Sequence, residues 1–277
     1  MQVAGSVFDV TFDGTAYQAG AGEVLQWIRR SASIVAGYYG VFPVPKLEIV
    51  VTAVDGDHVR GGKTFADPMP RILVSVGRAT SSGNLVDDWV LVHEMTHLAL
   101  PDVGRAHHWL EEGIATYVEG IERVQAGNMK APDLWQEYVT SMPKGLPAEG
   151  DRGLDQTHTW GRTYWGGALF CLAADVSIRE RSANRFGLQD ALREVLRQSG
   201  GMTADWPIER VFQVGDKATG TTVLSDLYRA MRDAPSAPDL PDLWSRLGVH
   251  AENGSVRLET GTPQSQIRDR ITLQSSR

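Results

Sequence analysis

The sequence predicts an α+β protein in which a mixed α/β N-terminal lobe, residues 1–105, precedes a mainly helical C-terminal lobe, residues 106–277. Two patterns support this prediction. Short β-branched runs alternate with an amphipathic segment as far as residue 77, and helical spacing of apolar residues dominates from residue 85 onward. The chain has 277 residues and is 42% hydrophobic, which is enough material for the core of one large domain or of two lobes.

The expected elements follow the changes of period along the chain. Strands are expected where apolar or β-branched residues run between turn residues, at 7–14, 47–54 and 71–77. Helices are expected where apolar residues recur every three or four positions, over 21–39, 85–100, 109–123, 134–142, 163–181, 188–198 and 222–232. Loops rich in Gly and Pro, at 142–155 and 234–242, separate the later helices.

Composition excludes several classes of partner. The net charge is −7 and no basic run is longer than Arg29-Arg30, so we expect no nucleic-acid partner. The longest apolar runs are far shorter than the roughly 20 residues that span a bilayer, so no membrane-spanning segment is expected. The start MQVAGSVFDV lacks the features of a signal peptide, which leaves the compartment open: the protein is cytoplasmic, or it is exported if the N-terminus was trimmed. The single cysteine, Cys171, is expected to be a buried structural thiol.

The segment WVLVHEMTHLAL, Trp89–Leu100, places two imidazoles and a carboxylate in an otherwise apolar helix. His93 and His97 are four residues apart, so both side chains lie on one face of the helix, about one turn apart. This geometry matches two nitrogen ligands of a tetrahedral Zn²⁺. Glu94 projects beside that face, where it can reach a water at the metal without being a ligand.

A catalytic zinc usually takes a third protein ligand, which must come from elsewhere. The extended pattern HExxHxxGxxH fails here, because Leu100 and Val103 stand where its Gly and third His should be. His107 and His108 lie near in sequence, but they fall at a loop-to-helix junction, where a solvated or capping role is common.

The best candidate for the third ligand is Glu112, in the segment WLEEGIATY. It is followed by Gly113, and glycine inside a helix is less favourable than alanine by about 1 kcal/mol. Close helix packing would explain that glycine and would let the Glu112 carboxylate reach the metal. Glu111 points about 100° away along the helical wheel and is expected to be an exposed charge. Thr116 is either a partner that orients the ligand Glu112 or a surface hydroxyl.

These segments resemble the gluzincin metallopeptidases. HEMTH followed by WLEEGIA is similar to their metal-binding segments, in which the third ligand is the Glu of W-L-x-E-G-x-A. The segment YWGGALFCLAADVSIRER, which begins at Tyr164, resembles the Y-x-x-G-A-L-x-x-x-x-x-D-x-x-I-R segment of the M61 glycyl aminopeptidase family. The resemblance covers roughly residues 45–200 and implies a thermolysin-like zincin fold with an active-site helix.

The resemblance implies a zinc-dependent metallopeptidase that acts on a peptide or protein substrate. His93, His97 and Glu112 would hold Zn²⁺, and Glu94 would be the general base toward a zinc-activated water. Tyr164 would donate a hydrogen bond to the oxyanion of the tetrahedral intermediate.

Two alternatives stay open. Tyr164 could instead belong to an apolar stripe that packs in the core, with His158 as a different donor. The whole protein could also be a non-catalytic binding or scaffold protein stabilised by zinc. Glu94 argues against the second alternative, because a structural site has no use for a base, and structural zinc usually takes four protein ligands.

One stretch departs from the M61 pattern, HVRGGKTFADP at 58–68. In that family a Glu in a G-G-x-E-H sequence anchors the free amino group of the substrate. Here the paired glycines are followed by Thr64 and Phe65 where Glu and His would stand. We therefore expect weak aminopeptidase activity and a preference for internal bonds or blocked N-termini. The alternative is that Asp67 or Glu111 supplies the anchor.

Overall fold

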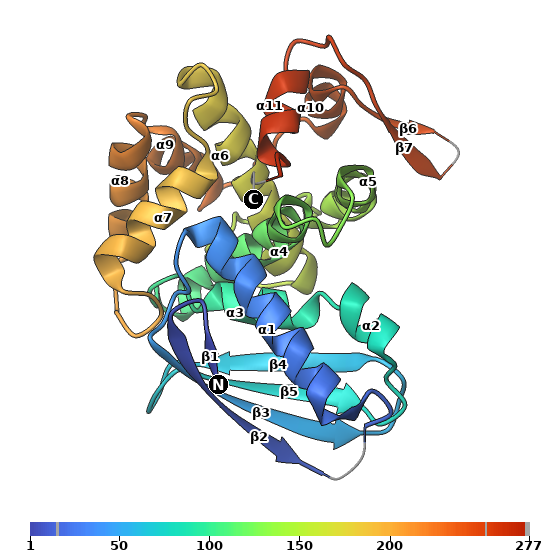
Figure 1. Ribbon diagram of the computed structural model, residues 1–277. Coiled ribbons are helices and arrows are strands. Elements are labelled where there is room, and N and C mark those ends of the chain that lie inside the picture. The colour runs from blue at the N-terminus through green and yellow to red at the C-terminus, as the bar shows by residue number, and fades with distance from the viewer. Residues whose placement is uncertain (15–16, 253, 275–277) are drawn as a thin grey trace. The chain divides into compact units, whose positions relative to one another are not determined.

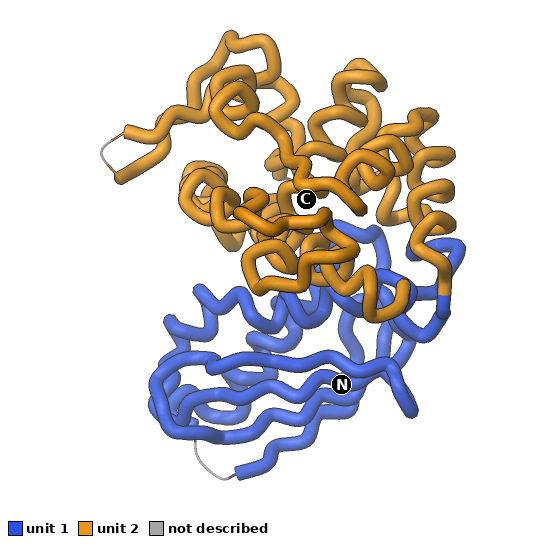
Figure 2. The backbone as a smooth tube through the Cα atoms, turned by 180° about the vertical axis from the view of Figure 1, so that it is seen from behind, with its two compact units in different colours: residues 1–102, 196–205 blue, residues 103–195, 206–277 orange. Residues whose placement is uncertain are grey.

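The computed structural model describes residues 1–14, 17–252 and 254–274. The chain divides into two compact units, coloured separately in Figure 2. Unit 1 comprises residues 1–102 and 196–205, and unit 2 comprises residues 103–195 and 206–277. The segment 196–205 belongs to unit 1 because its backbone bonds to residues just beyond the HEMTH helix: Met202 N donates to Leu98 O (3.1 Å) and Asp102 N donates to Ala204 O (2.9 Å).

Unit 1 contains a five-stranded mixed sheet in the order β1-β2-β3-β5-β4. Its strands are β1 (Gln2–Val3), β2 (Ser6–Asp13), β3 (Lys46–Val54), β4 (Val59–Phe65) and β5 (Arg71–Gly77). Strands β2, β3 and β5 are parallel, and β1 and β4 each pair antiparallel with their single neighbour. The long helix α1 (Gly20–Tyr39) connects β2 to β3 and runs across the strands in Figure 1.

The sheet buries one face. Residues that alternate along β3 and β5 are buried, and they are Leu47, Ile49, Val51, Ala53, Ile72, Val74 and Val76. The intervening Leu73 is exposed, which is the period-two pattern of a sheet covered on one side. The helix α3 (Val90–His97) packs along β4, and α1 packs against α3.

The edge strand β4 was not expected from the sequence. VRGGKTF contains two glycines and two basic residues, which gives it low intrinsic strand propensity. It forms nevertheless because β5 supplies an antiparallel partner, with Gly62 opposite Val74 and Thr64 opposite Ile72. The stretch that the sequence suggested as a loop preceding the HEMTH helix is therefore the edge of the sheet.

The helix expected over 85–100 is two helices, α2 (Ser82–Asp87) and α3 (Val90–His97). The break falls at Asp88, whose backbone is extended with φ −64° and ψ 136°. Its Oδ2 accepts hydrogen bonds from Leu91 N at 3.2 Å and from Trp27 Nε1 at 3.0 Å. A carboxylate that caps free backbone N–H groups starts a new helix, and so Asp88 fixes where the HEMTH helix begins.

Unit 2 is mainly helical. Its helices are α4 (His108–Gln125), α5 (Ala131–Ser141), α6 (Gly167–Arg181), α7 (Leu188–Ser199), which runs into unit 1, α8 (Ile208–Thr219), α9 (Val223–Met231), α10 (Leu240–Leu247) and α11 (Ser265–Ile271). Three short helical segments are η1 (Arg105–His107), η2 (Met142–Gly145) and the π-helical η3 (Arg162–Gly166). A hairpin joins β6 (Val249–Glu252) to β7 (Ser255–Leu258).

The sequence did not predict α8, α10, α11 or the hairpin. Helix α10 begins inside a stretch that was expected to be a loop because it is rich in proline. Asp239 caps this helix by accepting a hydrogen bond from Asp242 N at 3.1 Å, and Pro241 lies in the first turn, where proline is tolerated. Asp239 and Pro241 belong to the stretch that predicted a loop, and in the structure they start helix α10.

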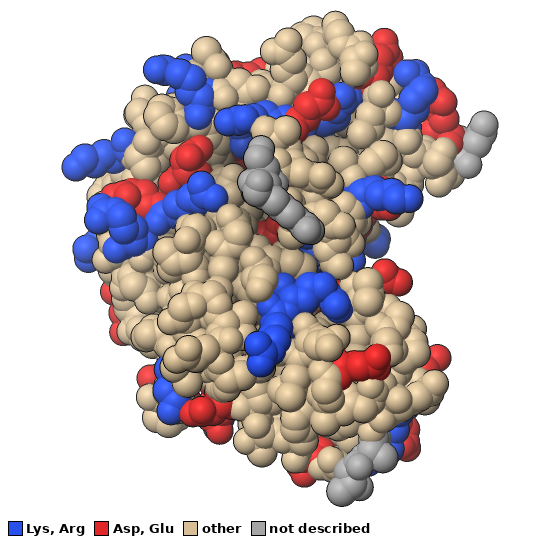
Figure 3. Space-filling view, viewed as in Figure 1, with Lys and Arg blue, Asp and Glu red and all other residues tan. Residues whose placement is uncertain are grey.

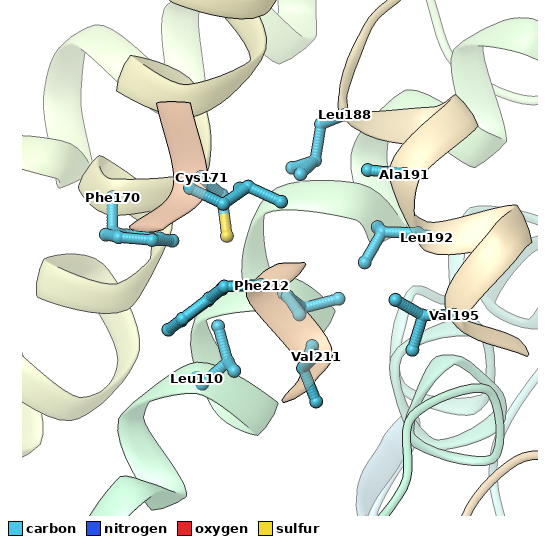
Figure 4. Close-up of a pocket in the computed structure, with 11 residues that line it drawn as sticks. Leu110, Phe170, Cys171, Leu188, Ala191, Leu192, Val195, Val211 and Phe212 are labelled. Atoms are coloured by element: carbon cyan, nitrogen blue, oxygen red, sulfur yellow. The ribbon is translucent and has the colours of Figure 1, made fainter. Parts of the chain in front are cut away.

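The core of unit 2 surrounds a small apolar cavity, drawn in Figure 4. Phe170 and Phe212 lie side by side there, with ring centroids 5.5 Å apart, and Leu110 and Leu192 contribute from other helices. Cys171 lines the same cavity and is buried, as the sequence predicted. Burial raises the pKa of its thiol far above the usual range, which makes a nucleophilic role for Cys171 unfavourable.

The surface carries charged side chains of both signs. Groups of Lys and Arg side chains lie among groups of Asp and Glu side chains on the face displayed in Figure 3. Among the residues that the structure describes, no helix is both long enough and apolar enough to cross a membrane.

Candidate metal centre

Helix α3 presents its two histidines side by side. The ring centroids of His93 and His97 are 4.9 Å apart and the rings meet edge to face. The ring of Trp89, which is 52% exposed, meets His93 edge to face at 5.7 Å. Leu91 and Met95 are fully buried, so the apolar residues of α3 fix the helix in unit 1. The spacing of four residues therefore gives the shared face that the sequence predicted.

Glu94 is buried and lies against strand β4. Thr64 Oγ1 lies 2.6 Å from Glu94 Oε2, and donates a hydrogen bond to it. A Cβ placed on Gly62 would lie 2.5 Å from Glu94 Cγ, which is closer than real Cβ atoms approach. The edge strand thus contacts the carboxylate through one glycine and one hydroxyl, and sequence reasoning had treated both residues only as part of an altered family pattern.

On α4, Glu112 is buried and faces His108. His108 Nε2 lies 3.3 Å from Glu112 Oε1, and His108 Nδ1 lies 3.2 Å from Glu111 Oε2. These hydrogen bonds, to Glu111 first and Glu112 second, raise the pKa of His108 to about 10. His108 therefore lies within hydrogen-bond reach of both carboxylates. Glu111 is half-buried and ion-paired, where the sequence predicted an exposed charge.

Gly113 allows α4 to pack very closely against α6. A Cβ on Gly113 would lie 2.4 Å from both Cα and the carbonyl carbon of Gly167, so no larger residue fits there. The close helix packing that the glycine predicted is confirmed, with α6 as the partner. This contact fixes the backbone immediately beside Glu112.

The ligand atoms of His93, His97 and Glu112 all lie within 4.8 Å of one another. Among the described residues, these three side chains form a group that could hold a metal ion. Two imidazole nitrogens and one carboxylate oxygen form a donor set that suits Zn²⁺, and three protein ligands leave a fourth position open. The donor chemistry of these residues therefore fits a catalytic zinc.

The other candidate ligands lie elsewhere. His107 Nδ1 lies 3.0 Å from Asp155 Oδ1, and His108 binds carboxylates as described above. Neither belongs to the group of three. Thr116 is half-buried and no side-chain hydrogen bond is described for it, and His158 is exposed.

Tyr164 lies in the π-helical segment η3. Its ring stacks on the ring of Trp160 with centroids 5.8 Å apart, and Trp160 is 61% exposed. Trp165 and Leu169 are buried, but Tyr164 is only half-buried, so it lies outside the buried stripe to which the sequence could have assigned it. A π-bulge in a helix is uncommon and is frequent at functional sites.

A buried ion pair holds η3 in place. Arg162 Nε lies 2.8 Å from Asp151 Oδ2, and Arg162 NH1 donates to Gly145 O at 2.7 Å. A buried pair of this kind strongly disfavours loss of either partner, because the remaining charge would be unpaired. The segment that carries Tyr164 is therefore fixed to the loop before it.

The fold of this chain is similar to that of solved zinc metallopeptidase structures. No protein-family model and no curated protein matches the chain. Among solved structures, it is similar to an aminopeptidase N family protein from Idiomarina loihiensis, with a TM-score of 0.67 and 14% identity over 90% of this chain and 48% of that one.

A second similar structure is a point variant of an M1 zinc metallopeptidase from Deinococcus radiodurans, with a TM-score of 0.55 and 15% identity over 87% of this chain and 52% of that one. The same metallopeptidase variant, bound to a Tyr-Ser-Ala substrate, gives a TM-score of 0.52 with 15% identity over 83% of this chain and 49% of that one.

These similarities show a shared fold. The predicted mixed α+β architecture is confirmed, and it is similar to the domains of aminopeptidase N-type zinc metallopeptidases. The neighbours are M1 enzymes, zinc-dependent hydrolases of peptide bonds, and belong to the gluzincin group that the sequence resembles. The chain spans about half the length of the structures it matches.

Proposed function

We propose that this chain is a zinc-dependent metallopeptidase of the gluzincin type, with a thermolysin-like fold and an M61-like tyrosine segment. The observation that carries the proposal is the convergence of His93, His97 and Glu112 within 4.8 Å, with the carboxylate of Glu94 on the same helix as the histidines. His93, His97 and Glu112 are the proposed zinc ligands. The proposed substrate is a peptide or protein.

Each proposed residue has a distinct chemical task. A bound Zn²⁺ would act as a Lewis acid, polarising the scissile carbonyl and lowering the pKa of a water. Glu94 accepts the proton of the attacking water on a carboxylate oxygen and passes it to the leaving amine. Tyr164 donates its hydroxyl hydrogen to the oxygen that becomes negatively charged in the tetrahedral intermediate.

The Glu94→Gln variant tests the proposal. The amide keeps the size of the side chain but cannot take a proton, so zinc should be retained while kcat falls by about 10²-fold or more. His97→Ala should instead lose most of the zinc, because only two protein ligands are left. Zinc is measured by elemental analysis, and turnover by mass spectrometry of a random peptide library.

The competing function is a zinc-stabilised binding or scaffold protein. A chain that binds one zinc and cleaves nothing in the library would establish that function and refute the peptidase. Full zinc occupancy in His97→Ala would refute the ligand assignment separately. Glu94 favours the peptidase, since its carboxylate is buried beside the two histidines without serving as a third ligand.

We also propose that the enzyme prefers internal bonds or blocked N-termini. Thr64 stands at the position where the M61 pattern has an amine-binding Glu, and its hydroxyl is hydrogen-bonded to Glu94. The two replacement anchors are poorly suited to the task. Asp67 is exposed, and the Glu111 carboxylate is already paired with His108.

A further inference from the structure

We propose that Thr64 is a positioning residue for the general base, holding one oxygen of the Glu94 carboxylate so that the other oxygen takes the proton. This inference rests on the proposed peptidase function. It assigns a role to the edge strand β4, which contributes no zinc ligand.

The register of the sheet directs Thr64 toward α3. In the antiparallel pair of β4 and β5, Thr64 lies opposite Ile72 and Gly62 lies opposite Val74. Ile72 and Val74 are buried on the covered face of the sheet. Directly opposite residues project from the same face, so Thr64 and Gly62 face the side on which α3 packs.

The hydroxyl of Thr64 has two acceptors on the same residue. Glu94 Oε2 lies 2.6 Å away and the backbone oxygen of Glu94 lies 2.9 Å away. The shorter distance is typical of a hydroxyl that donates to an ionised carboxylate, and such charge-assisted bonds are about twice as strong as neutral ones. The carbonyl distance matches an ordinary hydrogen bond. Because the hydroxyl carries one hydrogen, we assign its donation to the nearer acceptor, Oε2, and the carbonyl oxygen shares that hydrogen in a bifurcated contact.

Gly62 supplies the space for this arrangement. A Cβ at this position would lie 2.5 Å from Cγ, 2.9 Å from Cδ and 3.1 Å from Oε1 of Glu94. Any side chain on residue 62 would therefore displace the carboxylate. The two positions on one face of β4 have complementary tasks, because Gly62 admits the carboxylate and Thr64 binds it.

The consequence is that the two carboxylate oxygens differ. Oε2 is held by Thr64, whereas Oε1 accepts no hydrogen bond from the residues that the structure describes. A free glutamate side chain rotates about several bonds, and a base must be held in a productive geometry to act efficiently. Thr64 removes much of this freedom and leaves Oε1 to accept the proton of the water.

The test replaces the hydroxyl without changing the shape of the side chain. Thr64→Val should lower kcat on a peptide substrate about 10-fold to 100-fold, with KM and zinc content unchanged, because only the orientation of the base is lost. Thr64→Ser keeps the hydroxyl and should keep kcat within about threefold of the wild type. Thr52→Val on β3 is the matched control, since Thr52 has no described side-chain hydrogen bond, and its kcat should be that of the wild type.

Two kinetic outcomes would overturn the proposal. One is wild-type kcat in Thr64→Val. The other is an equal loss in Thr64→Val and Thr64→Ser, which would show that the shape of the side chain matters and its hydroxyl does not.

Crystal structures of the wild type and of Thr64→Val give a second readout that needs no turnover. The Glu94 carboxylate should leave its position beside β4 or adopt more than one rotamer in the variant. An unchanged, single position would refute the role of Thr64. A wild-type chain that cleaves no peptide would instead refute the proposed function, and the structures would still decide whether Thr64 holds Glu94.

Discussion

Asp155 shows how one carboxylate can organise the start of a helix, α4. It accepts hydrogen bonds from Trp109 Nε1 at 2.7 Å and from Tyr228 OH at 2.8 Å, and His107 Nδ1 lies 3.0 Å away. These three residues belong to η1, α4 and α9, while Asp155 lies in the loop before η3. Asp155 therefore connects the first turn of α4 to the rest of unit 2. Helix α4 is the helix that carries Glu112.

Replacing Asp155 by alanine should lower the free energy of unfolding by about 2–4 kcal/mol, because three part-buried polar groups lose one charged partner. Asp9→Ala is the control, since Asp9 pairs with Lys46 at 2.8 Å where both side chains are more than half exposed. Exposed ion pairs contribute little to stability, so this variant should unfold near the wild-type midpoint. Urea denaturation of both variants gives the comparison. Equal midpoints for the two variants would show that Asp155 contributes no more to the free energy of unfolding than Asp9 does.

At the scale of single residues, local geometry decided what the sequence could predict. The pairing of His93 with His97 follows from helical spacing alone. Glycine is unfavourable inside a helix, so Gly113 indicated close helix packing and made the adjacent Glu112 the candidate ligand. Thr64 could not be assigned its contact with Glu94 in this way. That contact depends on which strand lies beside α3, and no periodicity in the chain records it.

At the scale of elements, the errors of prediction cluster where tertiary contacts override propensity. Strand β4 forms from a glycine-containing segment because β5 pairs with it, and the expected helix 85–100 divides because the side chain of Asp88 caps a second start. The helix expected over 163–181 contains the π-helical η3, which is fixed by the buried pair of Arg162 with Asp151. Each of these departures lies beside a proposed site residue.

The π-helical segment makes a prediction about Tyr164. Tyr164→Phe removes only the hydroxyl, so kcat should fall about 10-fold to 10³-fold while zinc content and the unfolding midpoint stay unchanged. Tyr17→Phe is the control, because it removes a hydroxyl that donates to Val51 O at 3.0 Å in the sheet of unit 1. Its kcat should equal that of the wild type. Steady-state kinetics on one peptide substrate compares them, and wild-type kcat in Tyr164→Phe would mean that the hydroxyl of Tyr164 is not an oxyanion donor.

At the scale of the whole molecule, the order of the chain did not predict the compact units. The expected lobes met at residue 105. In the structure, unit 1 also contains residues 196–205, which follow most of the helices in the sequence. The hydrogen bonds of this segment to Leu98 and Asp102 join residues about 100 positions apart in sequence. Contacts of that separation leave no local pattern. The change from α/β to helical composition was visible, because it depends only on the period of the apolar residues.

The choice of substrate is also a property of the whole molecule. An enzyme that removes N-terminal residues must bind a cationic amino group, which requires a carboxylate free to accept it. Thr64 stands where the resemblance to the M61 pattern predicts a Glu, and its hydroxyl donates a hydrogen bond to Glu94. The neighbouring Lys63 is exposed and would repel an ammonium group.

We therefore expect peptides that differ only in N-terminal acetylation to be cleaved at similar rates, with kcat/KM values within about threefold, because Thr64 offers no carboxylate to the free amine. Mass spectrometry of the products identifies the bond that is cut, which should be internal. The Thr64→Glu variant is a further comparison. It places an acidic residue at position 64, and it should reduce turnover by displacing the base Glu94. Cleavage of the free-amine peptides alone, abolished by acetylation in the wild type, would show that another carboxylate anchors the amino group and that the chain is an aminopeptidase.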